Sequence, residues 1–146
     1  MTVQPEEAIR AKILSGPAAL RIVDRCYPHK APQNVTRPYV TYRRISGNPE
    51  RHLLGPASLA PARIQVDSFA GTYAGAKALA DDIRLSLDGV RGAEISVGSA
   101  ICYVRSIALE NDSDDFIEPQ AGTDDGVYRV MQDWLVVYVL PAPTPN

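Results

Sequence analysis

The sequence has few of the residues on which metal centres, disulfide frameworks and imidazole chemistry depend. Only two cysteines and two histidines occur in 146 residues, and no C-x-x-C pair is among them. Neither a zinc site nor a disulfide scaffold is therefore expected, and no cofactor is predicted. We expect Cys26 and Cys102 to be small buried hydrophobic residues, with a disulfide as the alternative.

Long hydrophobic runs are also absent. The most apolar run, residues 134–140, has the length of a strand and is far below the roughly 18–20 residues of a membrane-spanning helix. Residues 1–7 lack the basic and apolar regions of a secretory signal. With 45% hydrophobic and 22% charged residues, the composition indicates one soluble domain made in a reducing cytoplasm. We expect this domain to span residues 1–140, followed by a proline-rich tail over 141–146.

Charge is nearly balanced overall but is uneven along the chain. Residues 1–66 hold ten Lys or Arg and four Asp or Glu, about +6, whereas residues 67–146 hold five and thirteen, about −8. Unevenly charged, solvated loops are one explanation. The alternative is a subunit with a basic flank and an acidic flank, which suits head-to-tail packing against copies of itself.

Residue patterns predict a chain of mixed α/β class. Apolar periodicity predicts helices over residues 5–14, 18–23 and 73–87, the last with Thr72 as N-cap and Gly89 as a left-handed stop. β-branched and alternating segments predict strands over 39–45, 62–68, 100–109 and 127–139. Loops are expected over 27–33 and over 47–61, the second long enough to be functional.

An acidic segment separates the last two predicted strands. Residues 110–126 hold seven acids and no base, so this segment must be solvated or paired with a partner. It fails as an EF-hand loop, because Phe116 and Ile117 stand at the fifth and sixth positions counted from Asp112. Looser binding of a cation by the clustered carboxylates remains open.

The sequence matches none of the catalytic or phosphate-binding motifs considered. The glycines of residues 71–77 lack the spacing and the Gly-Lys-Ser/Thr ending of a phosphate loop, and no G-x-S-x-G elbow occurs. His29 and His52 lie in proline-rich segments and are expected to be polar loop residues. Asp81 and Asp82 are adjacent on a predicted helix, so their side chains do not face each other as an acid–base pair would.

Nucleic-acid binding is poorly supported as a primary role. The isoelectric point is about 5.6, and the only basic run interleaved with an aromatic residue is 42–44. Arg43 and Arg44 are expected to point to opposite faces of their strand, so at most one contributes to any one surface.

The order and spacing of several short segments nonetheless form a pattern that covers residues 8–138. The segments are VDRCYP at 23–28, APQ at 31–33, RPYV at 37–40, RISG at 44–47, ARIQVD at 62–67, TYAGAKALA at 72–80, LSLDG at 85–89, YRV at 128–130 and DW at 133–134. Together they resemble the tail completion, or tail terminator, family of long-tailed bacteriophages and phage-derived gene transfer particles.

This resemblance implies a fold and a role in the virion. The fold would be α+β, a mostly antiparallel sheet of about four main strands with the long helix and the N-terminal helix packed on one face. The subunits would form a six-membered ring at the head-proximal end of the tail tube. That ring would stop tube polymerisation and join the tail to the head connector, while genome DNA passes through it without specific binding. The family has no known catalytic residues, so no enzymatic role is expected.

Two sets of residues are candidates for assembly contacts. The acidic set, expected to line the lumen or contact a neighbouring ring, is Asp112, Asp114, Asp115, Asp124 and Asp125. The set expected to contact another subunit or the tail tube is Arg43, Arg44, Arg51, Leu53, Leu54 and Arg63. Leu53 and Leu54 could instead fold back over the core.

Three other functions remain open from the sequence. A neck adaptor or stopper would use the same kind of ring and differ only in its neighbours. An enzyme would need a pocket with a perturbed titratable group. A monomeric domain unrelated to phage would form no ring at any concentration.

Overall fold

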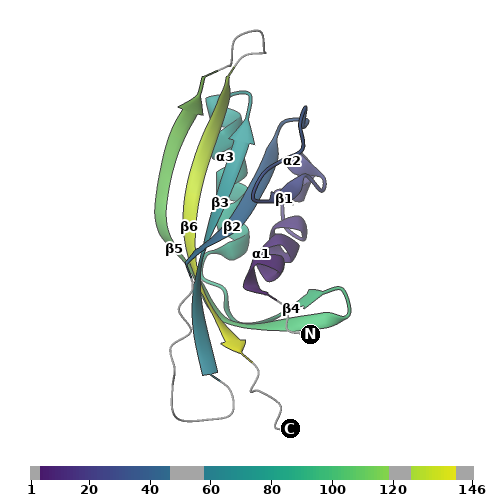
Figure 1. Ribbon diagram of the computed structural model, residues 1–146, viewed down its shortest axis with the longest axis vertical. Helices are drawn as coiled ribbons and strands as arrows, with labels where there is room; N and C mark the ends of the chain where they lie inside the picture. Colours follow the sequence, from purple (N-terminus) through teal and green to yellow (C-terminus); the bar gives the residue numbers. More distant parts are fainter. Residues whose placement is uncertain (1–3, 47–57, 119–125, 141–146) are drawn as a thin grey trace.

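The computed structural model describes residues 4–46, 58–118 and 126–140. It contains three helices and six strands in these ranges: α1 (Pro5–Leu14), α2 (Ala19–Ile22), β1 (Cys26–Pro28), β2 (Tyr39–Ser46), β3 (Ser58–Ala70), α3 (Tyr73–Leu87), β4 (Arg91–Val97), β5 (Ala100–Ile117) and β6 (Val127–Leu140). The strands form one sheet in the order β1-β2-β3-β6-β5-β4 (Figure 1). Strands β1 and β2 are parallel, and the other neighbouring pairs are antiparallel.

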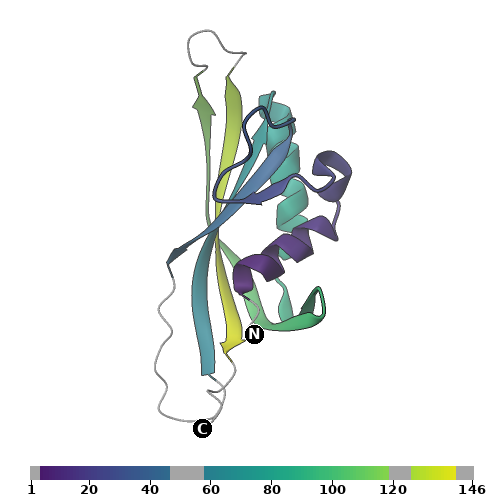
Figure 2. The same ribbon diagram turned by 45° about the vertical axis from the view of Figure 1, so that its right-hand side comes forward.

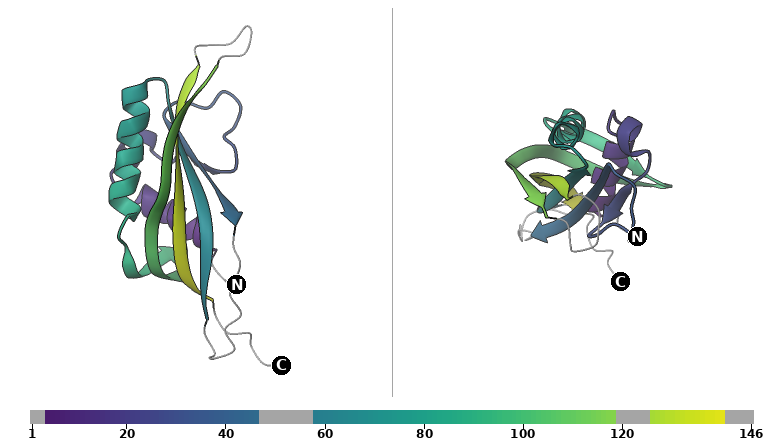
Figure 3. Two further views of the ribbon diagram at one scale, coloured as in Figure 1. Left: turned by 90° about the vertical axis from the view of Figure 1, so that its left-hand side faces the viewer. Right: turned by 90° about the horizontal axis from the view of Figure 1, so that it is seen from above.

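The helices lie on one side of this twisted sheet. Figures 2 and 3 show α1 and α3 against the same face, with the opposite face free of helices. Helix α3 packs on β3, β5 and β6, and α1 packs on β2 and β4. Side chains alternate accordingly, because neighbouring residues of a strand point to opposite faces. We call the face under the helices the helix face and the other the open face.

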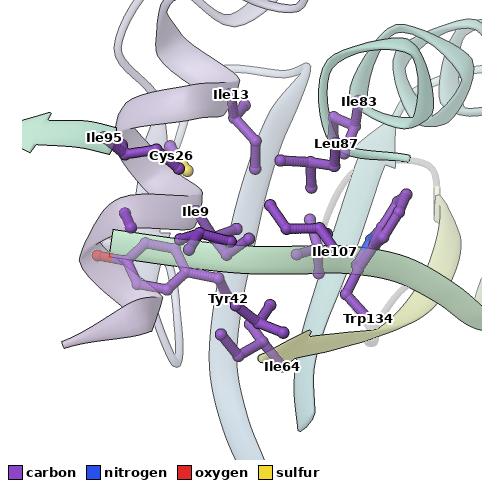
Figure 4. Close-up of a cluster of buried hydrophobic side chains, with 14 of the residues drawn as sticks. Ile9, Ile13, Cys26, Tyr42, Ile64, Ile83, Leu87, Ile95, Ile107 and Trp134 are labelled. Carbon is purple, nitrogen blue, oxygen red and sulfur yellow. The ribbon is translucent and has the colours of Figure 1, made fainter. Parts of the chain in front are cut away.

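The hydrophobic core fills the space between the helix face and the helices. Ile9 and Ile13 of α1 meet Ile83 and Leu87 of α3 above Trp134 of β6 (Figure 4), and all five side chains are fully buried. Burying a large aliphatic side chain contributes roughly 1.5–3 kcal/mol. The core therefore fixes both helices relative to the sheet.

The long helix was predicted correctly at both ends. Helix α3 begins after Thr72, whose side-chain oxygen accepts a hydrogen bond from the backbone N–H of Gly75 at 3.0 Å. It ends at Leu87, and Gly89 takes the expected left-handed conformation with φ of 81°. The small residues Ala76 and Ala80 are buried and allow close approach to the sheet.

The sheet has more strands than the four expected. Strand β1 covers Cys26–Pro28 and so takes in residues 27 and 28 of the loop predicted over 27–33, and the unpredicted β4 covers Arg91–Val97. Three residues suffice for β1 because it adds to the edge of β2, where Pro28 needs no partner for a missing N–H. Strand β3 begins at Ser58, so residues 58–61, expected to lie in a loop over 47–61, belong to the strand, and residues 47–57 lie outside the described ranges.

The largest correction concerns the acidic segment. Strand β5 does not end at Leu109 but continues to Ile117, in antiparallel register with β6 as far as Val127. Local propensity disfavours a strand there, since Asp and Asn are depleted in strands, but the long partner strand supplies a ladder of backbone hydrogen bonds. No helix in the described ranges is both long and apolar enough to span a membrane.

Candidate assembly surfaces

The acidic residues of β5 do not form one surface. Asp112 and Asp114 lie opposite Gln132 and Val130, which are buried on the helix face, whereas Asp115 lies opposite Arg129 on the open face. Residues directly opposite across two strands share a face. The predicted set is thus divided, with two members at the margin of the helix face and one on the open face. Asp124 and Asp125 lie outside the described residues.

Asp114 connects β5 to the first turns of α3. Its carboxylate accepts a hydrogen bond from the Tyr73 hydroxyl at 3.0 Å and lies 3.2 Å from the Lys77 ammonium. The Tyr73 hydrogen bond and then Lys77 lower the pKa of Asp114, and the same contact with Asp114 raises the pKa of Lys77. All of these groups are solvent-accessible, so the cluster orients side chains more than it stabilises the fold.

Arginines on the open face are matched with oxygen acceptors. Arg63 lies 3.7 Å from Glu110, Arg129 lies 3.1 Å from Asp115, and Arg43 donates a hydrogen bond to Gln65 at 3.3 Å. The two ion pairs join β3 and β6 to the acidic part of β5. They leave the open face nearly neutral across the middle of the sheet.

A hollow of about 500 Å³ opens on the same face between β2, β3 and residues 29–35. Asp67 lies on its wall with 8% of its surface exposed, and Gln65 donates hydrogen bonds to its two carboxylate oxygens at 2.8 and 3.1 Å. Burial raises the pKa of Asp67 despite these hydrogen bonds. Stacked rings of Tyr39 and Phe69, 4.7 Å apart, form another part of the wall.

Arg44 lies on the opposite face from Arg43, as predicted. Its guanidinium donates hydrogen bonds of 3.1 and 2.7 Å to one carboxylate oxygen of Glu6, on α1, and another of 3.1 Å to Gln4. Partial burial by itself would lower the pKa of Arg44. The hydrogen bonds with Glu6 and the charge of its carboxylate outweigh this effect, so the pKa of the guanidinium is raised. Within the chain, Arg44 therefore holds the start of α1 against β2.

The other predicted contact residues cannot be placed. Arg51, Leu53 and Leu54, together with His52, lie outside the described residues. The alternative positions of the two leucines, exposed or folded over the core, stay as predictions.

The sequence did not predict the exposed apolar and basic side chains around α2. Leu20 is 90% exposed and Val23 is 64% exposed. Val23 also adopts φ of 60° and ψ of −94°, a conformation that is strained for a β-branched residue. The only signal in the sequence was that residues 18–23, Ala-Ala-Leu-Arg-Ile-Val, have more apolar positions than a four-residue helix can bury.

The cysteines form no disulfide with each other and belong to no cluster of metal ligands among the described residues. Cys26 and Cys102 are both buried and free, as expected, and burial raises the pKa of Cys26 to about 12. Within the described residues, no group of three or more His, Cys, Asp or Glu side chains is placed to hold a metal ion.

Comparison with known proteins decides the family. The family model described as tail completion protein gp17 matches residues 7–134. The chain belongs to the tail completion protein family. It is a structural tail protein, as the sequence resemblance indicated.

A solved structure shares this tail completion fold. A chain from the virion of a native gene transfer agent particle superposes with a TM-score of 0.61 at 14% identity, covering 92% of this chain and 94% of that chain. At that identity the likeness establishes the fold alone. No curated protein matches the sequence.

Proposed function

We propose that this protein forms a closed ring of six identical subunits at the head-proximal end of the tail tube. The ring ends polymerisation of the tube protein and joins the tail to the head connector, leaving a passage for DNA. The observation that carries this proposal is the family match over residues 7–134. The ring, its number of subunits and its neighbours come from what the resemblance implies.

The shape of the fold suits such a subunit. A single sheet with helices on one face has two different edges, so a neighbour can bind each edge through a different surface. Such a head-to-tail contact closes into a ring when a whole number of equal rotations completes one full turn without a shift along the axis.

Charge on the open face is compatible with a passage for DNA. Lys and Arg side chains free to contact phosphates would bind DNA and slow its movement. Arg63 and Arg129 are instead paired with Glu110 and Asp115. We propose that these pairs reduce the attraction of this face for nucleic acid, and that Arg43 and Arg63 contact the neighbouring subunit or the tube.

The test is electron microscopy of particles produced with and without the gene, scored for tail length and head attachment. Abnormally long or ragged tails beside unattached, filled heads are expected, because nothing stops the tube or joins it to the head. Complementation with the wild-type gene on a plasmid is the control. Tails of normal length that fail to attach would place the protein in the neck, and normal particles would refute the proposal.

A further inference from the structure

The two ends of the sheet differ in charge. Residues 8–46, which form most of α1 and all of α2, β1 and β2, contain eight Lys or Arg and a single acid, Asp24. At the other end, residues 108–118 contain five acids and no base. Glu110, Asp114 and Asp115 pair with Arg63, Lys77 and Arg129 of other elements, which leaves Asp112 and Glu118 as the acids without an ion pair among the described residues. The strand order places β1 and β2 at one side of the sheet and β5 near the other (Figure 1).

The basic end also presents apolar side chains to solvent. We define it as Leu20, Arg21, Val23, Arg25 and Lys30. Leu20 and Val23 are its exposed apolar members. Arg21 is half-exposed although it contacts Asp82 at 2.6 Å, and Lys30 makes no ion pair with any described residue. Exposed apolar groups ringed by charge are typical of a protein contact.

The surface at the other end of the sheet is the outer edge of β5. Strand β4 pairs with β5 only as far as Ser106, and backbone hydrogen bonds of Gly89 and Val90 extend the contact to Ile107. Beyond that point no described strand lies on the outer side of β5. We define this acidic edge as Asp112, Asp114 and Phe116 of β5 together with Glu118 just beyond it; Glu110 is not included, because it pairs with Arg63 on the open face. Asp112 and Glu118 form no ion pair with any described residue, and Phe116 is partly exposed.

The edge at β1 is closed, in contrast to the acidic edge. The Cys26 carbonyl accepts a hydrogen bond from Arg10 at 3.2 Å, the Pro28 carbonyl accepts one from the Lys30 N–H at 2.7 Å, and Pro28 has no N–H. Strand addition at β1 is therefore disfavoured. The basic end must be recognised through its side chains, whereas β5 offers both side chains and backbone.

We infer that the basic end of one subunit docks against the acidic edge of the next copy in the ring. The inference rests on the proposed ring and names the two surfaces that build it. Opposite charge and exposed apolar groups at opposite ends of the sheet give the two complementary surfaces that a head-to-tail contact requires. The acids also prevent β5 from pairing with unrelated strands, as charged residues on edge strands do.

Charge reversal on each surface tests the inference. The basic-end variant is Arg21→Glu with Lys30→Glu, and the acidic-edge variant is Asp112→Lys with Glu118→Lys. Each is purified, examined for ring formation by light scattering after size exclusion, and used to complement the gene deletion. The control variant is Glu94→Lys, which reverses an exposed charge on β4. Urea unfolding followed through Trp134 verifies that each variant folds.

Each charge-reversed variant alone is expected to lose ring formation and to reduce complementation at least tenfold. An equal mixture of the two variants is expected to recover rings in which they alternate. The reversed basic end of one variant then meets the reversed acidic edge of the other, and the two unchanged surfaces meet at the next contact, so every contact joins opposite charges. Rings that persist in either single variant would overturn the inference while leaving the proposed ring intact. A mixture that recovers nothing would also overturn it. Wild-type protein that never forms rings, alone or in particles, would refute the proposed function itself.

Discussion

Leu87→Ala is expected to destabilise the protein far more than Leu85→Ala, although the two residues are in the last turn of the same helix. Leu87 is fully buried among Ile9, Ile83 and Trp134, whereas Leu85 is 71% exposed. Truncating a buried leucine removes its transfer free energy and leaves a cavity, at a cost of roughly 2–5 kcal/mol. The exposed substitution should change stability by no more than about 0.5 kcal/mol, since alanine is the better helix former.

Urea unfolding at low protein concentration measures the difference without a contribution from association. Trp134 is the single tryptophan and is buried, so its fluorescence reports loss of the core. With a slope of about 2 kcal/mol per molar urea, a loss of about 3 kcal/mol lowers the midpoint by about 1.5 M. Equal midpoints for the two variants would refute the placement of α3 on the sheet.

Three further measurements examine other parts of the structure. Thr72→Ala should cost about 1 kcal/mol of the free energy of unfolding through loss of the N-cap, and Thr72→Ser should restore most of it; equal losses would contradict the cap. Burial raises the pKa of Asp67 above its ordinary 3.8, so folding favours the protonated carboxyl. The free energy that this contributes to folding is fully present below about pH 3.8 and is lost as pH rises through the folded-state pKa. Asp67→Asn should therefore gain stability relative to wild type as pH rises above about 4, measured by urea midpoints, with the exposed Asp24→Asn as control; a constant difference would exclude this titration. Cys26 and Cys102 are both buried, and burial raises the pKa of each thiol, so both should react with a disulfide reagent only as fast as the protein unfolds; rapid labelling of the native protein would show at least one of them to be accessible.

The sequence was most informative where local signals and tertiary packing agree. Helix α3 has a capping threonine, apolar residues at regular spacing and a glycine beyond its end, and both of its ends were predicted. That Arg43 and Arg44 point to opposite faces followed from strand alternation alone, and their partners Gln65 and Glu6 confirm it; which arginine takes which face did not follow from the sequence.

Prediction failed where distant segments decide local structure. Asp112 and Asp114 have low strand propensity, yet β5 extends through them because β6 continues beside it. Strand β1 consists of three residues, the last of them Pro28, and among the described strands only β2 pairs with it. The division of the acids between two faces depends on this register, so composition could identify the acidic segment but not its two surfaces.

Electron cryomicroscopy of intact particles tests the central claim most directly. A reconstruction of the head–tail junction should contain a ring of six copies of this fold between the last ring of the tail tube and the head connector. Each copy should place its basic end, Leu20 to Lys30, against the acidic edge of its neighbour. A junction without this fold, or copies located elsewhere in the particle, would contradict the account.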